Sequence, residues 1–408
     1  SDTAKPFYIP IAGLATGAAM MSVEKTAAPG TLVLYFGAQS FMNIFMGWLM
    51  RTKVTLPEGT FIKLTNETLG ENLTGCPAGF ALTALQQVVS FAVFWIGYLA
   101  LYNTSKRYQI KQIKTKFEVL CIVIFGCVFA LNIALNNFSL GYISIAVNLI
   151  IRSCLPLTTF LSQKVLASFD LYKKTDCKWL EITLMVVGVG CAAGFTWARI
   201  AGSAATGHGG STGSMILGVI MCVASLLCGS LNLALAGVLG GQTKLNVFDT
   251  VAYMAPPATL FLLPIACFLQ KPVPGEWPKV FGQDHMSDLG ILLGVWSINK
   301  GTIAWLVLSG IFSFVYNIIQ FNIVHKLSPA ATAMGGNFNK AALIFLTLLL
   351  PFLRVSDLPG PPYNYCIWFF VILNIAAFTG YSYLQIKDKE EKPKETKETK
   401  EEKNLLET

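Results

Sequence analysis

The chain contains ten almost purely apolar stretches, each about 20 residues long, which is the length a helix needs to cross a bilayer core of about 30 Å. Backbone polar groups in lipid must be paired internally, which only helices and closed barrels achieve. The runs are too long and too continuously apolar for barrel strands. The sequence therefore predicts an all-α, polytopic membrane protein with ten transmembrane helices, at about 31–50, 79–102, 117–136, 141–163, 180–200, 214–239, 248–269, 302–324, 328–352 and 363–385.

Composition agrees with this prediction. Only 13% of the 408 residues are charged and 54% are hydrophobic, with a mean hydropathy of +0.57. Soluble proteins carry about 25% charged residues. The deficit excludes a typical soluble enzyme, a disordered regulator and a free nucleic-acid binder. The net charge of +8 arises mostly from short loops between the apolar runs, so we expect no nucleic-acid partner.

The ten cysteines do not predict a disulfide framework or a metal site. Eight of them lie inside apolar runs, where cysteine behaves as a small hydrophobic residue. Cys76 and Cys177 lie in loops that we place on opposite sides of the membrane. No CxxC-type spacing occurs, so we do not expect structural zinc or another metal.

Charged loops give the orientation. Basic residues follow the second, fourth, sixth and eighth runs, and the segment 105–116 reads SKRYQIKQIKTK. The positive-inside rule places these loops in the cytosol. The loop after the first run carries two glycosylation sequons, at Asn66 and Asn72, which fit the opposite, lumenal side. Both chain termini are then cytosolic. The sequence does not decide whether the asparagines are glycosylated.

Two flanking segments fall outside the ten runs. Residues 7–21 are apolar but short, and we interpret them as an interfacial or packed helix before the first span, with an eleventh span as the alternative. The tail 386–408 is rich in Lys, Glu and Thr and is predicted to be solvated and disordered. The sequence does not decide whether a targeting peptide has been removed.

The ten runs divide into two halves of five, 31–200 and 214–385, joined by a lumenal connector at 201–213 and preceded by a segment at 1–30. Aligning Arg152 in the fourth run with Lys340 in the ninth gives a weak internal similarity. Five helices per half is an odd number, so the halves would insert in opposite orientations. This is the arrangement of inverted-repeat transporters, whose ligand site lies near the bilayer midplane.

Arg152 and Lys340 each lie about 11 residues into their runs, or about 16–17 Å along a helix. A charge at that depth is costly. No Asp or Glu lies in the middle of any run, and Glu181 and Asp249 fall at run ends. We interpret the two cations as lining a water-filled cavity that takes an anionic ligand; the alternative is packing against backbone carbonyls. The lack of intramembrane acids favours exchange of anions over coupling to a cation.

Three segments resemble the drug/metabolite transporter superfamily, in the branch of nucleotide-sugar transporters and triose-phosphate translocators. They are FALTALQQ (80–87), NFSLGYISIAVNLIIRSCLP (137–156) and VYNIIQFNIVHKLSPAATAMGGNFNK (315–340), in the order that the branch shows. The resemblance covers roughly residues 31–385. It implies a transporter without a cofactor, and a homodimer is compatible with it.

The same resemblance implies a set of substrate-binding residues. GNFNK (336–340) is similar to the GALNK motif of GDP-mannose transporters, in which Asn339 and Lys340 would contact base and phosphate. A phosphate translocator would have Arg where this chain has Ala341, and His where it has Leu149. The candidate substrate-binding residues are Arg152, Lys340, Asn339, Asn337, Tyr316, Asn317, Asn148, Gln320 and Gly336. Hydrogen bonding between helices is an equal alternative for Asn148 and Gln320.

The leading hypothesis is an antiporter of the Golgi or ER membrane that exchanges a nucleotide sugar for the nucleoside monophosphate. The runner-up is an organic-phosphate/phosphate exchanger of a plastid-type envelope. A membrane-embedded enzyme would need a placed acid, base or nucleophile, and no His or carboxylate occurs in mid-run. A scaffold or receptor would leave Arg152 and Lys340 unexplained.

Overall fold

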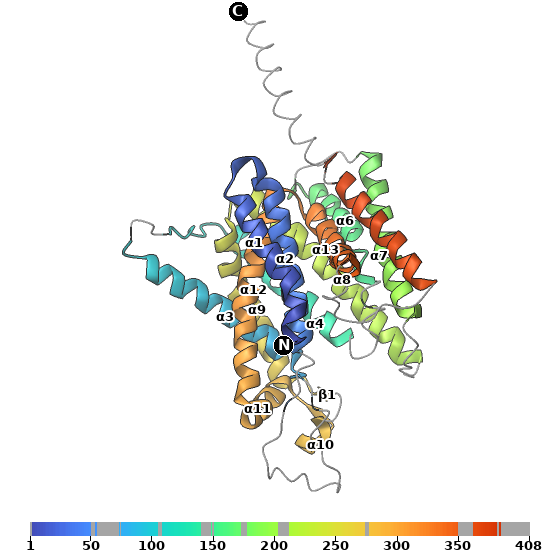
Figure 1. Cartoon of the computed structure of the whole chain (residues 1–408). Coiled ribbons are helices and arrows are strands. Elements are labelled where there is room, and N and C mark those ends of the chain that lie inside the picture. The colour runs from blue at the N-terminus through green and yellow to red at the C-terminus, as the bar shows by residue number, and fades with distance from the viewer. Residues whose placement is uncertain are drawn as a thin grey trace, which may run out of the picture.

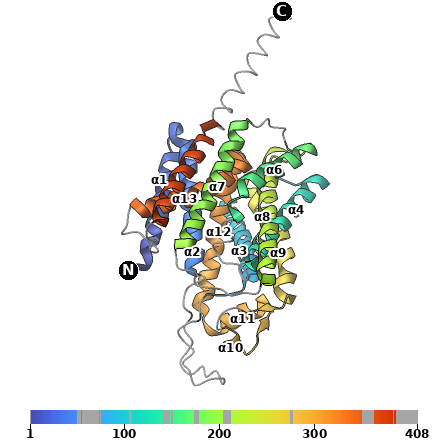
Figure 2. The ribbon, with the colours of Figure 1, turned by 90° about the vertical axis from the view of Figure 1, so that its right-hand side faces the viewer.

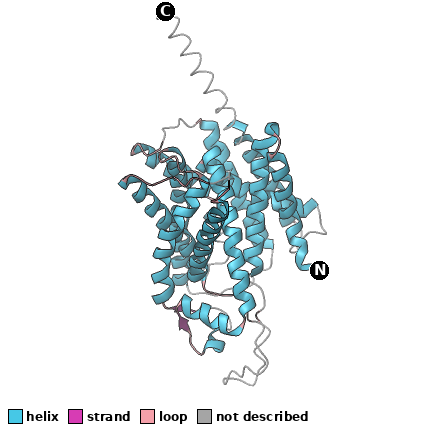
Figure 3. Ribbon diagram, turned by 90° about the vertical axis from the view of Figure 1, so that its left-hand side faces the viewer, coloured by secondary structure: helices cyan, strands magenta, loops and turns pink. Residues whose placement is uncertain are grey.

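The structure, a computed structural model, describes residues 2–49, 54, 73, 75–104, 108–139, 148, 151–172, 178–202, 212–273, 277–349, 362–381 and 383–384. The predictions for Asn66, Asn72, Cys177 and the tail 386–408 lie outside these residues. Within them the fold is a bundle of long helices (Figures 1 and 3). The helices are α1 (Tyr8–Met21), α2 (Ala27–Leu49), α3 (Gly79–Leu101), α4 (Lys116–Ser139), α6 (Leu155–Ser168), α7 (Trp179–Gly202), α8 (Thr212–Gly241), α9 (Val247–Phe268), α10 (Trp277–Phe281), α11 (Asp288–Ile298), α12 (Lys300–Lys326), α13 (Pro329–Leu349) and a last helix Tyr363–Tyr381.

Several helices coincide with predicted apolar runs. The run at 79–102 is helix α3, and the run at 248–269 is α9, each within one residue. Six helices of the described part are long and apolar enough to cross a membrane: α3, α4, α8, α9, α12 and Tyr363–Tyr381. Large apolar side chains face outward, with Leu260 70% and Phe268 81% exposed. An apolar outer surface of this kind suits lipid and is rare on soluble monomers. The chain is a polytopic all-α membrane protein.

Helix α1 packs against α2. The short 3-10 helix Asp2–Phe7 leads into α1, and a second one, Glu24–Thr26, joins α1 to α2. A Cβ on Gly17 would lie 2.4 Å from Leu34 N, and one on Gly37 2.5 Å from Leu14 N, so only glycine permits this close approach. At the end of the 3-10 helix before α1, the Phe7 ring lies tilted against the Phe41 ring of α2, with centres 5.4 Å apart at 58°. The segment predicted as an interfacial or packed helix is thus packed along much of α2.

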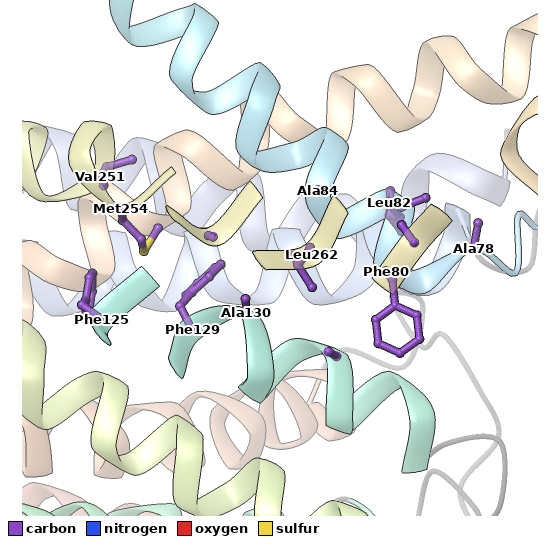
Figure 4. Packing of buried hydrophobic residues seen from close by; sticks show 14 of the residues in the cluster. Ala78, Phe80, Leu82, Ala84, Phe125, Phe129, Ala130, Val251, Met254 and Leu262 are labelled. Atoms are coloured by element: carbon purple, nitrogen blue, oxygen red, sulfur yellow. The ribbon is translucent and has the colours of Figure 1, made fainter. Parts of the chain in front are cut away.

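The largest apolar core extends from α2 to α13, and Figure 4 shows the part of it between α3, α4 and α9. Phe125 of α4, Met254 and Leu262 of α9 and Leu82 of α3 are fully buried there. Gly126 lies under Pro257, where a Cβ would approach the ring to 2.7 Å. These contacts pack α9 against both α3 and α4, and α4 also packs closely on α8.

The segment after α9 contains structure that the apolar runs did not predict. Strands β1 (Lys271–Pro272) and β2 (His285–Met286) pair antiparallel, with Lys271 opposite Met286. Helices α10 and α11 accompany them at one end of the bundle (Figure 2). With 11 residues, α11 is too short to span a bilayer, and the Ser287 side chain caps its first turn by accepting from Gly290 N at 3.2 Å.

A buried ion pair joins this segment to the N-terminus of α3. Lys271 Nζ lies 2.5 Å from Asp288 Oδ1, and Asp288 Oδ2 accepts from the N–H groups of Phe80 at 2.5 Å and Ala81 at 3.2 Å. Lys271 also donates to Pro77 O at 2.9 Å and lies 5.4 Å from the Phe80 ring centre. The carboxylate therefore satisfies N–H groups that the first turn of a helix leaves unpaired. We refer to these residues as the Asp288 cluster.

A second cluster holds the N-terminus of α9 against the loop that follows α3. Asp249 of α9 accepts from Tyr108 OH at 3.1 Å and from Lys111 N at 3.2 Å. Asn246 caps α9 by accepting from Asp249 N at 2.8 Å and donates to Tyr108 OH. Lys111 Nζ pairs with Glu118 at 3.1 Å. We refer to these residues as the Asp249 cluster. In it, the segment after α3 holds the start of α9. In the Asp288 cluster, the segment after α9 holds the start of α3.

Candidate functional site

Arg152 lies among helices α4, α8 and α12. Its backbone is helical and the residue as a whole is partly exposed, and its guanidinium donates from Nη2 to Asn132 Oδ1 of α4 at 3.2 Å. Among the residues that the structure describes, no carboxylate forms an ion pair with Arg152. Ser225 of α8 holds Asn132 in turn, because its Oγ lies 2.6 Å from Asn132 O and 3.2 Å from Asn132 Oδ1. Within the described part of the chain, the cation thus meets a neutral amide and keeps most of its five N–H donors without a protein acceptor.

The helix that carries Arg152 is interrupted directly after it. The run at 141–163 predicts one continuous helix, but residues 153–154 form a turn and α6 begins at Leu155. Pro156 explains the break, since proline has no N–H to donate to the carbonyl four residues earlier, which is that of Arg152. Across the interface, Asn337 Nδ2 of α13 donates to Ser153 O at 2.7 Å. The break therefore brings a backbone carbonyl and a predicted site residue together beside Arg152.

The predicted GNFNK segment lies on α13 against α2. Asn339 Nδ2 donates to Gln39 Oε1 of α2 at 2.5 Å. A Cβ on Gly336 would lie 3.3 Å from Gln39 Nε2, so glycine leaves space for that amide. The backbone of Lys340 is helical, but its side chain lies outside the described structure. The prediction that its ammonium lines the same cavity as Arg152 therefore stays a prediction.

An aromatic pair connects α2 and α12 next to Arg152. The rings of Tyr35 and Tyr316 stack with centres 6.4 Å apart at 17°. Tyr316 also interacts electrostatically with Arg152. The predicted residue Tyr316 is thus near the predicted cation, and Tyr35 joins it from the first long helix. Tyr35 is 2% exposed and Tyr316 is partly exposed, so Tyr316 is the ring of the pair that a ligand could reach.

The other predicted residues are placed differently. Asn148 is buried, and its Nδ2 donates to Asn136 Oδ1 at 3.0 Å and to Ser139 Oγ at 2.9 Å, which matches the interhelical alternative. Asn317 is 3% exposed, and its Nδ2 has no hydrogen-bond partner among the described residues. Gln320 is partly exposed on α12. The structure brings together Arg152, Tyr316 and Asn337, and it uses Asn148 within the packing.

Sequence reasoning missed four polar residues of this region: Asn132, Ser225, Tyr35 and Gln39. Each interrupts an apolar stretch and could have been noticed for that reason. Their partners, however, lie from 20 to 300 positions away in the chain. Only the packing of the helices reveals those pairings. A fully buried Gln87 on α3, whose amide atoms have no partner in the described part, was likewise not singled out.

The fold and this region define a multi-pass helical membrane protein with a cation held by neutral groups inside the bundle. No protein-family model matches the chain. Curated relatives match at low identity. A probable sugar phosphate/phosphate translocator of Arabidopsis thaliana is 20% identical over 66% of this chain and 74% of its own length. A second protein of that description is 20% identical over 60% of each chain.

A third relative from Arabidopsis thaliana is named UDP-uronic acid transporter 1 and is 19% identical over 60% of this chain and 69% of its own length. A solved crystal structure superposes with a TM-score of 0.45 at 12% identity, over 85% of this chain and 94% of that one. The relatives confirm the resemblance to the nucleotide-sugar and triose-phosphate branch of the drug/metabolite transporters.

Proposed function

We propose that this protein is an antiporter for a phosphorylated anionic metabolite, with a nucleotide sugar entering in exchange for a nucleoside monophosphate. The observation that carries the proposal is Arg152, an arginine inside the bundle with an amide and no carboxylate as its described partner. A guanidinium binds phosphate oxygens in a bidentate manner. The ligand would supply the counter-charge, and each exchanged anion would neutralise the site in turn.

The packing of the helices supports two related halves. We count α2, α3, α4, the run that ends with α6, and α7 as the first five spans. The second five are α8, α9, α12, α13 and Tyr363–Tyr381. Helix α4 then packs on α8 and α9, and its counterpart α12 packs on α2 and α3. Helix α6 packs on α8, and its counterpart α13 packs on α2. Two pairs of counterparts also pack on each other, namely α3 on α9 and α6 on α13. We infer ten spans in two inverted halves, 31–200 and 214–385, that rock about the region of Arg152.

Names of relatives support the substrate class. One curated relative is named for a UDP-uronic acid, which is a nucleotide sugar. The described polar groups near Arg152 include the amide of Asn337 and the Tyr35–Tyr316 ring pair. Amide donors suit hydroxyls and base edges, and a ring face suits a nucleobase. A transporter of this kind performs no covalent chemistry and would reside in the Golgi or ER membrane.

A second candidate is exchange of an organic phosphate for inorganic phosphate across a plastid-type envelope. Two relatives carry the description sugar phosphate/phosphate translocator, which favours it. The departures at Leu149 and Ala341 from the basic residues expected of phosphate translocators weigh against it.

Ligand-dependent unfolding of the purified protein separates these candidates. A ligand that binds the folded state at 100 times its Kd stabilises it by about 2.7 kcal/mol. We expect one nucleotide sugar and its nucleoside monophosphate to raise Tm. Proteoliposomes preloaded with that monophosphate should then take up the nucleotide sugar by counterflow. A rise with sugar phosphates and phosphate alone would favour the second candidate. No response to any of these anions would contradict both.

A further inference from the structure

Asn132 contacts the Arg152 guanidinium and is itself fixed from two sides. Its Oδ1 accepts from Arg152 Nη2 at 3.2 Å, and the Ser225 hydroxyl lies within hydrogen-bond distance of both its carbonyl oxygens, backbone and side chain. Arg152 comes from the broken fourth run, Asn132 from α4 and Ser225 from α8. The orientation of the guanidinium therefore depends on the α4–α8 interface.

Gly229 of α8 makes room for the Asn132 amide. A Cβ at this position would lie 2.9 Å from Asn132 Oδ1, 3.2 Å from its Cγ and 3.4 Å from its Nδ2. The atom that a methyl group would displace is the acceptor for Arg152. An alanine at 229 would therefore act on Arg152 without touching it, by moving the amide that orients it.

The charge of the residue at 132 decides the charge of the site. An asparagine accepts a hydrogen bond from the guanidinium but leaves its positive charge in place. An aspartate has nearly the same shape and would form an ion pair with Arg152 at the same position. Two charges at this distance inside a protein attract far more strongly than in water. The new carboxylate would then pair with the Arg152 guanidinium and compete with an incoming anion for it.

We propose that Asn132 is a positioning residue for Arg152, that Gly229 is required to seat it, and that its neutrality keeps Arg152 available to a phosphate-bearing ligand. The inference rests on the proposed function, because it assigns a role to Arg152 in anion binding. It adds that affinity is set at the α4–α8 interface as well as by the residues that contact the ligand.

The test uses the full-length protein with uridine monophosphate and inorganic phosphate as probes. We expect Asn132→Asp to fold with an unliganded Tm equal to or above that of the wild type, while the Tm rise caused by either probe is lost. Lowering the pH enough to protonate the new carboxylate should restore part of the response. A residue that only supports packing would lower the unliganded Tm and show no such recovery.

Two further variants keep the inference testable if Asn132→Asp folds poorly. Asn132→Ala and Gly229→Ala should each raise the KM for counterflow by about ten- to a hundredfold, the range expected for one hydrogen bond to a charged group, with kcat changed much less. Gly190→Ala on α7 is the matched control, because a Cβ there meets nothing within 4 Å. It should leave KM unchanged.

The outcomes separate this inference from the proposed function. If Arg152→Ala abolishes the probe response while the Asn132 and Gly229 variants bind like the wild type, the positioning role is wrong and the proposed function stands. If Arg152→Ala retains wild-type binding and exchange, the proposed function fails and the inference fails with it. Equal KM changes in Gly229→Ala and Gly190→Ala would also contradict the positioning role.

Discussion

Lys271 and Arg152 are both cations inside the folded chain, and their surroundings differ. Lys271 has a carboxylate at 2.5 Å, a carbonyl oxygen at 2.9 Å and an aromatic face at 5.4 Å. Arg152 has one amide oxygen at 3.2 Å. The fold therefore supplies an acid where a cation joins two segments. At Arg152 the described groups orient the charge and leave it uncompensated, which is the condition that an anion-binding site requires.

Removing Arg152 should have the largest effect, and it should be on transport. Loss of a cation that pairs with a buried charged ligand costs about 2–5 kcal/mol or more. We expect Arg152→Ala to abolish counterflow in proteoliposomes and the Tm to stay within a few degrees of the wild type, and Lys340→Ala to behave in the same way. Normal counterflow in either variant would remove that residue from the site.

Removing the acid of the Asp288 cluster should lower stability, whereas removing Arg152 should abolish transport and leave Tm nearly unchanged. Asp288→Ala leaves Lys271 without its carboxylate and the Phe80 and Ala81 N–H groups without an acceptor. Breaking a buried pair in this way costs about 3–5 kcal/mol, so a large drop in Tm is expected. Exposed Asp284 provides the control Asp284→Ala, which should change little. A Tm equal to that of the wild type in Asp288→Ala would show that the cluster adds no stability.

A smaller loss is expected in the Asp249 cluster. Tyr108→Phe removes the hydroxyl that donates to Asp249 and accepts from Asn246. Hydrogen bonds to charged groups contribute about 1.5–3 kcal/mol. Asp249 is buried, but Tyr108 is partly exposed and Asn246 is exposed, which places the effect at the lower end. Thermal unfolding of Tyr108→Phe against Tyr8→Phe, a change at a 54% exposed ring, measures the difference. Equal Tm values would mean that the loop is held by its backbone contacts alone.

The last effect concerns alkaline pH beside the Asp288 cluster, and it is the smallest of the four near pH 9, where it only begins. Burial raises the pKa of the Cys76 thiol from 9.0 to about 12, and the nearby Asp288 carboxylate adds to this rise. Because the folded state holds its proton more tightly than the unfolded state, stability should be intact below pH 9 and fall as pH rises towards 12. The slope from one such group is at most about 1.4 kcal/mol per pH unit. Cys76→Ala should flatten that part of the Tm-against-pH curve, and an unchanged curve would assign the loss to other groups.

Helix positions followed from the sequence because length and apolar content are local properties. Helices α3 and α9 begin and end within one residue of the predicted runs. The break after Arg152 was within reach of the sequence, since Pro156 cannot continue the hydrogen-bond ladder. The partners Asn132 and Gln39 were not, because each contact joins residues that only the packing of helices brings together. The short helix α11 was not predicted, because an apolar run of 11 residues is too short to be recognised as a membrane span.

The reciprocal placement of the two polar clusters has a mechanical consequence. Helices α3 and α9 are fastened to each other's trailing segments at opposite ends, with the apolar core shown in Figure 4 between those ends. Two helices that are held together at both ends cannot tilt against each other until one end is released. Because α3 belongs to the first half and α9 to the second, the proposed rocking of the halves has to open at least one of these two clusters.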